Sequence, residues 1–425
     1  MTLSLADVTD AHKRIASGIY LSPCPESIPL SEIAGCRAYC KLDYLQRTGS
    51  FKERGARNAL LLLDQAQRQR GVISASAGNH ALGLAYHGKL LGIPVTVVMP
   101  RFAPLIKRST CRQLGATIVL DGESFSEAYD RAQQMAHESG LTYIHGFDDP
   151  AIIAGQGTMG LEILDQVPDV QAIVVPIGGA GLAAGVSLAV KSRSPGVKVF
   201  GVEPQRAAGF SASLAAGRVV KVTVQPTVAD GLAVGKVGEL AFEIARPRIE
   251  RVVTVSEEEL SLAMLRLVEL EKSVVEGAGA APLAALMSGK LPELAGLRTV
   301  MILSGGNVDP LILNRVIEKA LVTDGRLGRF TAVVVDRPGG LARLTQLIAQ
   351  SGASIQEIVH DRAFAGPDIG AVNVLCTVET TDRTHLEELY TLLAREGIPA
   401  APLRFPSITS KPAPYASAPH DSHAV

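Results

Sequence analysis

The segment VISASAGNHALGLAYHGKLLGIPVTVVMP, residues 72–100, contains the pattern that decides the fold. It opens with a short apolar and β-branched run (72–76), passes through small residues into a helix-length stretch ending at Gly92, and returns to a second apolar run (95–100). Glycine just after a helical stretch is the usual helix stop. The order strand, helix, strand predicts a parallel βαβ unit.

The same alternation extends over the first 310 residues. Two further helical stretches, LIKRSTCRQLG and FSEAYDRAQQMAHESG, also end at glycine. Strand-like runs follow at 116–121, 142–147, 172–177, 197–204 and 299–306. This alternation predicts an α/β fold of parallel sheets with helices on both faces. Ligands bind at the carboxyl ends of such strands, so we expect the chemistry in the loops that follow them.

The pattern changes near residue 325. Strand-like runs at 330–336, 353–364, 371–380 and 399–405, with helical stretches after the first and third, give the order β-α-β-β-α-β. This order is the ferredoxin-like arrangement, and we expect a separate domain over residues 328–405. Residues 406–425 are rich in Pro, Ser and Ala and are predicted to be disordered.

Composition excludes several classes of partner. Lys plus Arg number 41 and Asp plus Glu 42, a net charge of −1, so neither nucleic acid nor an anionic membrane is expected. No apolar run approaches the ~18 residues of a membrane span. The first twenty residues lack the apolar core of a signal peptide, and we expect a cytoplasmic location. The sequence favours reduced, packed thiols for Cys24, Cys36, Cys40, Cys111 and Cys376.

Three loops carry candidate chemistry. In the first (48–56), Lys52 opens a predicted helix; it could form a Schiff base only if burial lowers the pKa of its amine. In the second (74–81), small residues let a ligand approach the backbone, and N–H groups at the helix start suit a carboxylate. An ordinary turn is an equal alternative. His80, in the first helical turn, is interpreted as structural rather than as a base.

The third loop (176–185) exposes consecutive N–H groups before a helix, which favours a dianion. It lacks the Lys and Ser/Thr of a nucleoside-triphosphate loop and the acidic residue of a dinucleotide-binding loop. A monophosphate that stays bound fits this pattern. A fourth segment (302–307) ends a strand with Ser304 and two glycines, and by itself could be a plain turn.

Together these segments resemble one family. The motifs SFKERGA (50–56), SASAGNHA (74–81), GGAGLAAG (178–185) and LSGGN (303–307) occur in the order and spacing of the fold-type II pyridoxal-phosphate (PLP) enzymes, in the threonine dehydratase (threonine ammonia-lyase) and serine racemase branch. The resemblance covers about residues 5–320. It implies a tryptophan-synthase-β-like catalytic domain (1–320) of two doubly wound parallel-sheet subdomains, the smaller (about 48–145) inserted in the larger. Residues 330–405 resemble an ACT domain, an amino-acid-binding regulatory module.

The resemblance also implies roles for single residues. Lys52 would be the catalytic residue that carries the cofactor aldehyde and then moves the α-proton. Asn79 would bond the ring 3′-oxygen, and the hydroxyl of Ser304 would partner the pyridine nitrogen. The phosphate would rest on Gly178, Gly179, Ala180, Gly181 and Leu182. The substrate carboxylate would bind the backbone of Ser76, Ala77, Gly78, Asn79 and His80.

Four positions depart from the family pattern or leave a choice open. Ala180 replaces a common glycine, and we expect its φ to be negative. Ala77 stands where racemases carry a serine acid/base, which favours dehydration. Gly209 stands where a carboxylate would complete a divalent-cation site beside Glu203, so we expect no metal. Glu276 either faces the cofactor or has a structural role.

The implied activity is α,β-elimination from L-threonine to 2-oxobutanoate and ammonia, and from L-serine to pyruvate. Alternatives are 3-hydroxyaspartate dehydratase, serine racemase, or a non-catalytic amino-acid sensor. The step would belong either to isoleucine biosynthesis or to threonine catabolism. For residues 328–405 we expect a branched-chain amino-acid effector, isoleucine or valine, and pairing into a homo-oligomer, dimer or tetramer. A purely structural dimerisation domain is the alternative.

Overall fold

The computed structural model describes residues 3–103, 105–361, 370–398 and 400–403. Two compact units divide the chain, one ending at Ala320 and the other beginning at Leu321. The predicted disordered tail, 406–425, and the end of the strand predicted over 353–364 lie outside the described residues. Within the described ranges, no helix combines the length and apolar character needed to cross a membrane.

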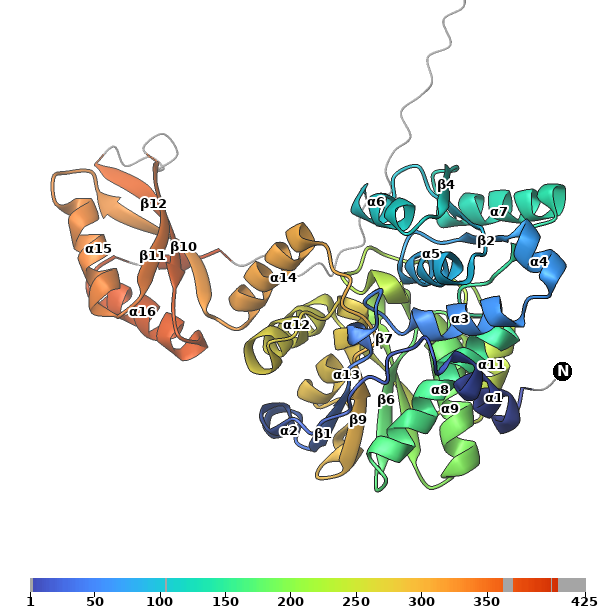
Figure 1. Ribbon diagram of the computed structural model, residues 1–425. Helices are drawn as coiled ribbons and strands as arrows, with labels where there is room; N and C mark the ends of the chain where they lie inside the picture. Colours follow the sequence, from blue (N-terminus) through green and yellow to red (C-terminus); the bar gives the residue numbers. More distant parts are fainter. Residues whose placement is uncertain (1–2, 104, 362–369, 399, 404–425) are drawn as a thin grey trace, which may run out of the picture. The chain divides into compact units, whose positions relative to one another are not determined.

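A five-stranded parallel sheet forms the larger part of the first unit (Figure 1). Its strands in spatial order are β1 (Arg37–Lys41), β9 (Arg298–Ile302), β6 (Ala172–Pro176), β7 (Lys198–Pro204) and β8 (Arg251–Val255). The apolar pattern predicted β6, β7 and β9 but not β1 and β8. β8 is an edge strand that begins with exposed Arg251, and β1 ends in the charged Lys41, so neither has a fully apolar run.

Helices cover both faces of this sheet, as the alternation predicted. Alternate residues of β6 point to opposite cores, Ile173 and Val175 to one and Ala172 and Val174 to the other. The first core is closed by α1 (Leu5–Ile15), α8 (Pro150–Gln166), α9 (Gly181–Arg193), α10 (Gly209–Ala216) and α11 (Glu239–Ala245). The second is closed by α2 (Ile28–Ala34), α12 (Glu257–Glu271), α13 (Gly277–Met287) and α14 (Pro310–Thr323).

A second parallel sheet of four strands forms the smaller part of this unit. Its spatial order is β4 (Thr117–Leu120), β3 (Val95–Met99), β2 (Val72–Ala75) and β5 (Thr142–Tyr143). Around it lie α3 (Lys52–Leu62), α4 (Gln65–Arg70), α5 (Asn79–Leu91), α6 (Leu105–Gln113) and α7 (Phe125–Ser139). Gly92 and Gly140 end α5 and α7 with φ of 67° and 63°, which glycine adopts without strain.

Four buried charged side chains join the start of α3 to the larger sheet. The Arg54 guanidinium donates to Asp43 (Nε–Oδ2 2.8 Å) and to Glu162 on α8 (Nη1–Oε1 2.6 Å). Lys41 on β1 donates to the other oxygen of Glu162 (Nζ–Oε2 2.6 Å). Since all four side chains are 6% exposed or less, the two cations and two carboxylates neutralise one another out of water.

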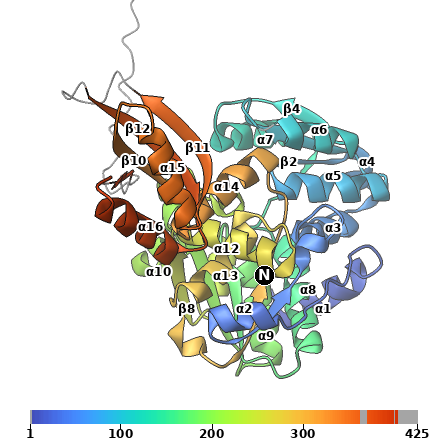
Figure 2. The same ribbon diagram turned by 90° about the vertical axis from the view of Figure 1, so that its left-hand side faces the viewer.

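The second unit has the predicted ferredoxin-like order. It consists of β10 (Leu327–Val335), α15 (Gly340–Gln350), β11 (Ser354–Asp361), β12 (Ala371–Glu379), α16 (Arg383–Arg395) and β13 (Ala400–Pro402). The antiparallel sheet has the order β11-β12-β10-β13. Figure 2 shows α15 and α16 against this sheet, and their buried leucines form one core with alternate residues of β10 and β12. The predicted α/β fold followed by a βαββαβ module is confirmed.

The buried charge cluster gives a stability prediction. Glu162→Gln should destabilise the first unit by about 3–5 kcal/mol, because it removes a carboxylate shared by two buried cations. Asp165→Asn, on the same helix, breaks only the exposed pair with Arg193 and should cost about 1 kcal/mol or less. Urea unfolding of both variants measures the difference; equal losses would contradict the stated role of the cluster.

Candidate active site

One cavity of about 860 Å³ lies within the first unit, at the carboxyl ends of β2, β6 and β9. Its walls include residues of all four loops singled out in the sequence, Lys52, Asn79, Gly178 and Ser304 among them. Ser76, Gly78 and His80 also line it, as do the residues from Gly179 to Leu182. Ala77 instead packs against the core of the smaller sheet. Four loops distant in sequence therefore share one cavity.

Lys52 begins α3 and projects its amine into this cavity. Nζ donates to the carbonyl oxygen of Gly146 (2.6 Å) and lies 5.2 Å from the centre of the Phe51 ring. Burial lowers the pKa of Lys52 to about 8, against the opposing effect of the Glu276 charge. A reactive lysine at this position requires that burial lowers the pKa of its amine, and the Lys52 amine meets this requirement.

The strand expected over 142–147 ends at Tyr143, and the next residues build the part of the cavity wall that the Lys52 amine contacts. There Nδ1 of His145 accepts the backbone N–H of Asp148 (2.8 Å). Phe147 then packs against the glycine loop: a Cβ on Gly179 would lie 2.3 Å from its ring, and one on Gly181 2.4 Å from its carbonyl oxygen. Glycine is required at both positions because of this close approach.

Backbone donors gather at the start of α9. Within the described parts of the chain, the N–H groups of Gly178, Gly179, Ala180, Gly181 and Leu182 have no protein acceptor. Amides left free in this way, together with the positive end of the helix dipole, bind phosphate. The loop thus offers a phosphate cradle without a cationic side chain.

Ala180 corrects one expectation. Its φ is 72°, in the left-handed region, not negative as predicted. This conformation costs an alanine about 1–2 kcal/mol. Ala180 is the N-cap of α9, and a left-handed residue directly before a helix turns consecutive N–H groups toward the same point. The tertiary arrangement of the cradle overrides the local preference of alanine.

A second set of free amides lies at the start of α5. Ser76 N donates to Val98 O (3.1 Å), but the N–H groups of Ala77, Asn79 and His80 find no acceptor among the described residues. They suit a carboxylate. The His80 ring is almost completely buried, and burial together with the positive charge of Lys52 lowers its pKa to about 3. A neutral, enclosed imidazole agrees with the structural role expected for His80.

The Asn79 side chain is held by two residues. Its Nδ2 donates to Oε1 of Glu276 (2.7 Å), and its Oδ1 accepts from Nδ2 of Asn307 (2.9 Å). Glu276 therefore faces the cavity, one of the two possibilities left open by the sequence. Burial and the nearby Asp230 raise the pKa of Glu276 to about 7. Asn307 was missed, although its place at the end of the LSGGN motif was a signal.

Ser304 follows β9 and lies next to the lysine loop. It is 2% exposed, lines the cavity, and accepts the backbone N–H of Phe51 at its carbonyl oxygen (3.0 Å). Its hydroxyl has no hydrogen-bond partner among the described residues and can therefore meet a ligand near Lys52. A neutral hydroxyl can partner an unprotonated ring nitrogen.

Glu203 has partners of its own. Its carboxylate accepts hydrogen bonds from Phe210 N (2.6 Å), Ser211 N (2.9 Å) and Ser211 Oγ (2.6 Å), which caps the start of α10. Across the residues that the structure describes, no three His, Cys, Asp or Glu side chains are grouped to hold a metal ion.

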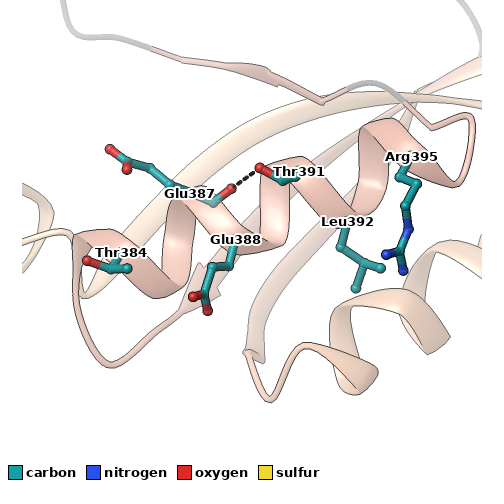
Figure 3. Close-up of a pocket in the computed structure, with 6 residues that line it drawn as sticks. All are labelled: Thr384, Glu387, Glu388, Thr391, Leu392 and Arg395. Atoms are coloured by element: carbon teal, nitrogen blue, oxygen red, sulfur yellow. Dashed lines mark hydrogen bonds between the residues drawn. The ribbon is translucent and has the colours of Figure 1, made fainter.

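A smaller hollow of about 320 Å³ lies on the second unit (Figure 3). Its lining comes from one side of α16: Thr384, Glu387, Glu388, Thr391, Leu392 and Arg395. Thr391 donates to the backbone oxygen of Glu387 within the helix. No sequence motif lies there.

The residues of the larger cavity fit pyridoxal phosphate. The free amides at α9 suit its phosphate, the Lys52 amine can bind its aldehyde, and Asn79 and Ser304 offer neutral partners for ring atoms. The free amides at α5 remain for the carboxylate of an amino acid.

Comparison with known proteins gives the same picture. Residues 15–305 match the model of the pyridoxal-phosphate dependent enzyme family. An L-threonine ammonia-lyase of Thermotoga maritima is 42% identical over 93% of this chain and 98% of its own length. Another from Geobacter sulfurreducens is 43% identical over 92% of this chain and 97% of its own.

Solved structures agree. The processed form of threonine deaminase isoform 2 from Solanum lycopersicum superposes with a TM-score of 0.72 at 38% identity, covering 75% of this chain and 87% of that one. Serine racemase from Dictyostelium discoideum gives 0.69 at 37% identity, covering 73% and 100%. With the cavity geometry, these matches show that the chain belongs to the pyridoxal-phosphate dependent enzyme family.

Proposed function

We propose that the chain is a threonine ammonia-lyase, which converts L-threonine to 2-oxobutanoate and ammonia and L-serine to pyruvate. The observation that carries the proposal is the place of the Lys52 amine, in one cavity with two separate sets of free backbone amides. One set suits a phosphate and the other a carboxylate. Similarity to L-threonine ammonia-lyases over more than nine tenths of the chain supports this choice of substrate.

Each group has a separate task in this proposal. Gly178 to Leu182 bind the cofactor phosphate, Asn79 and Ser304 orient the ring, and the backbone of Ser76 to His80 binds the substrate carboxylate. Bound pyridoxal phosphate supplies an electron sink that acidifies the α-hydrogen of an attached amino acid. With the cofactor bound, the amine of Lys52 would take that proton. In net terms the substrate would lose its α-hydrogen and its β-hydroxyl as one water, and hydrolysis would then replace its amine by a carbonyl oxygen, giving the 2-oxo acid and ammonia.

The lowered pKa of Lys52 suits this proton transfer. With a pKa of about 8, roughly one amine in ten is neutral at pH 7, far more than for an ordinary lysine. His80 is a poor competitor as a base because it is enclosed and its pKa is near 3. Lys52 is therefore the base that we assign.

Two catalytic alternatives share this cofactor. Serine racemase needs an acid/base on the face of the substrate opposite Lys52, and Ala77 has no group that could serve. 3-Hydroxyaspartate dehydratase would need a partner for a second substrate carboxylate, and only a substrate panel separates it from threonine. A non-catalytic amino-acid sensor is disfavoured because the desolvated amine of Lys52 is intact.

Capture of the cofactor by Lys52 should depend on pH. Because burial lowers the pKa of Lys52, its neutral fraction in the cofactor-free protein should rise between about pH 7 and 9. Borohydride reduction with pyridoxal phosphate should then fix a pyridoxyl group on Lys52, with a rate midpoint near pH 8, measured by peptide mass spectrometry. The exposed Lys198 is the internal control and should react far more slowly. A pyridoxyl group absent from Lys52 would refute the proposal.

Purified chain with pyridoxal phosphate should release 2-oxobutanoate from L-threonine, and Lys52→Ala should lower kcat by at least about 10²–10⁴-fold. Lys198→Ala, a change of an exposed lysine, should leave kcat unchanged. A panel of threonine, serine and 3-hydroxyaspartate, with chiral analysis of serine, compares the alternatives. Higher kcat/KM for 3-hydroxyaspartate, or D-serine as the main product, would replace the threonine assignment.

For the second unit we propose binding of isoleucine or valine, coupled to catalysis by about 1–3 kcal/mol, and pairing between copies of the chain. Deletion of residues 325–425 should retain turnover and abolish the effector response. The serine racemase structure, matched over its full length, covers only 73% of this chain, which supports an independent catalytic unit. Turnover with and without isoleucine measures the response; a response that survives the deletion would exclude this role.

A further inference from the structure

We propose that Asn307 is a positioning residue that sets which end of the Asn79 amide is presented to the cofactor ring. The inference rests on the ring contact proposed above for Asn79. Asn79 and Glu276 line the cavity, whereas Asn307 is a described residue outside that lining. It would act on the cofactor only through Asn79.

The orientation of the Asn307 amide follows from its partners. Nδ2 of Asn307 lies 2.6 Å from the carbonyl oxygen of Thr48, which can only accept a hydrogen bond. The same nitrogen lies 2.9 Å from the Asn79 amide. Since this NH₂ group donates both of its hydrogens, the atom of Asn79 that faces it must be the oxygen.

The other end of the Asn79 amide gives the same assignment when Glu276 is ionised. There Glu276 Oε1 lies 2.7 Å away, and an ionised carboxylate can only accept, so the facing atom of Asn79 is nitrogen. Glu276 is itself held, because its backbone N–H donates to Gly305 O (3.0 Å). Reversal of the Asn79 amide would place oxygen against carboxylate at one end and nitrogen against nitrogen at the other.

The backbone around Asn307 leaves it little freedom. Gly49 has a φ of 77°, and a Cβ on it would lie 2.4 Å from Oδ1 of Asn307. Gly306 N donates to Gly49 O (2.9 Å), which joins the loop before Lys52 to the loop after β9. Asn307 therefore connects three of the four motif loops. The second N–H of Asn79 remains for an acceptor in the cavity, which the ring 3′-oxygen supplies.

The test compares Asn307→Asp with Asn58→Asp in the full-length holoenzyme. Asn307→Asp keeps the shape but places oxygen against both Thr48 O and Asn79 Oδ1, so Asn79 must lose or reverse its orientation. Asn58 is a buried asparagine on α3 that donates to Ala151 O (2.7 Å) and accepts from Arg14 Nη1 (2.6 Å), away from the cavity lining. Its substitution controls for the same Asn-to-Asp change, with the same loss of a donor to a backbone oxygen, at a buried position outside the site. The readouts are the dissociation constant of pyridoxal phosphate, the absorption maximum of the bound cofactor and its pH dependence, and kcat against KM.

We expect Asn307→Asp to weaken cofactor binding by about ten-fold and to shift the absorption maximum in the direction of Asn79→Ala. Asn58→Asp should lower stability but leave the absorption maximum unchanged. In an Asn79→Ala background, Asn307→Asp should have no further effect on the spectrum. If Asn307→Asp does not fold, Asn307→Ser removes the same amide without adding a charge and serves in its place.

The outcomes separate the inference from the function on which it rests. Wild-type cofactor binding and absorption in Asn79→Ala would refute the ring contact of Asn79, and the inference with it. A change in Asn79→Ala without one in Asn307→Asp would overturn the inference alone. Additive effects in the double variant would also overturn it, since Asn307 would then act independently of Asn79.

Discussion

The position of Lys52 depends on the buried charged side chains around the first turn of α3. Arg54 lies two residues beyond Lys52 and contacts carboxylates from two separate elements, Asp43 before α3 and Glu162 on α8. A guanidinium out of water is tolerated only if both partners stay in place. The cluster therefore fixes the first turn of α3 against the larger sheet, and with it the direction in which the Lys52 amine leaves the helix.

In the proposed site, backbone amides rather than charged side chains would bind the anions. Two helices, α5 and α9, start at the same cavity and leave free amides there within the described residues. Gly179 and Gly181 are required because Phe147 packs against the loop, and small residues would also let a ligand approach the backbone. Ala180 adopts a left-handed conformation that is unfavourable for alanine, and this conformation completes the turn before α9.

Low dielectric in the cavity shifts its ionisable groups toward their neutral forms. Burial lowers the pKa of Lys52 and of His80 and raises that of Glu276. Lys52 thus becomes able to exchange a proton near neutral pH, whereas His80 stays neutral. Glu276 is close to its midpoint at neutral pH, and its ionised form is the one that accepts the Asn79 amide.

Local pattern was sufficient for much of the structure. The alternation of apolar runs and glycine-ended helical stretches predicted the parallel sheets, and the order of runs after residue 325 predicted the ferredoxin-like unit. The loops around Lys52, Asn79, Gly178 and Ser304 were also recognisable. Each of these signals resides in consecutive residues, because a strand end, a small-residue loop and a helix start are neighbours in sequence.

Other features were decided by contacts between distant residues. The strand β1 was not predicted because it ends in a charged residue, Lys41. This residue can be buried only because Glu162, more than one hundred residues away, pairs with it. Asn79 forms hydrogen bonds with Asn307 and Glu276, which lie 228 and 197 residues further along the chain. No local sequence pattern encodes such pairs. The φ of Ala180 likewise follows from packing around the loop. Sequence alone determined the elements and the motif loops; only the tertiary structure decided which polar atoms meet, since hydrogen-bond partners are selected by proximity in space.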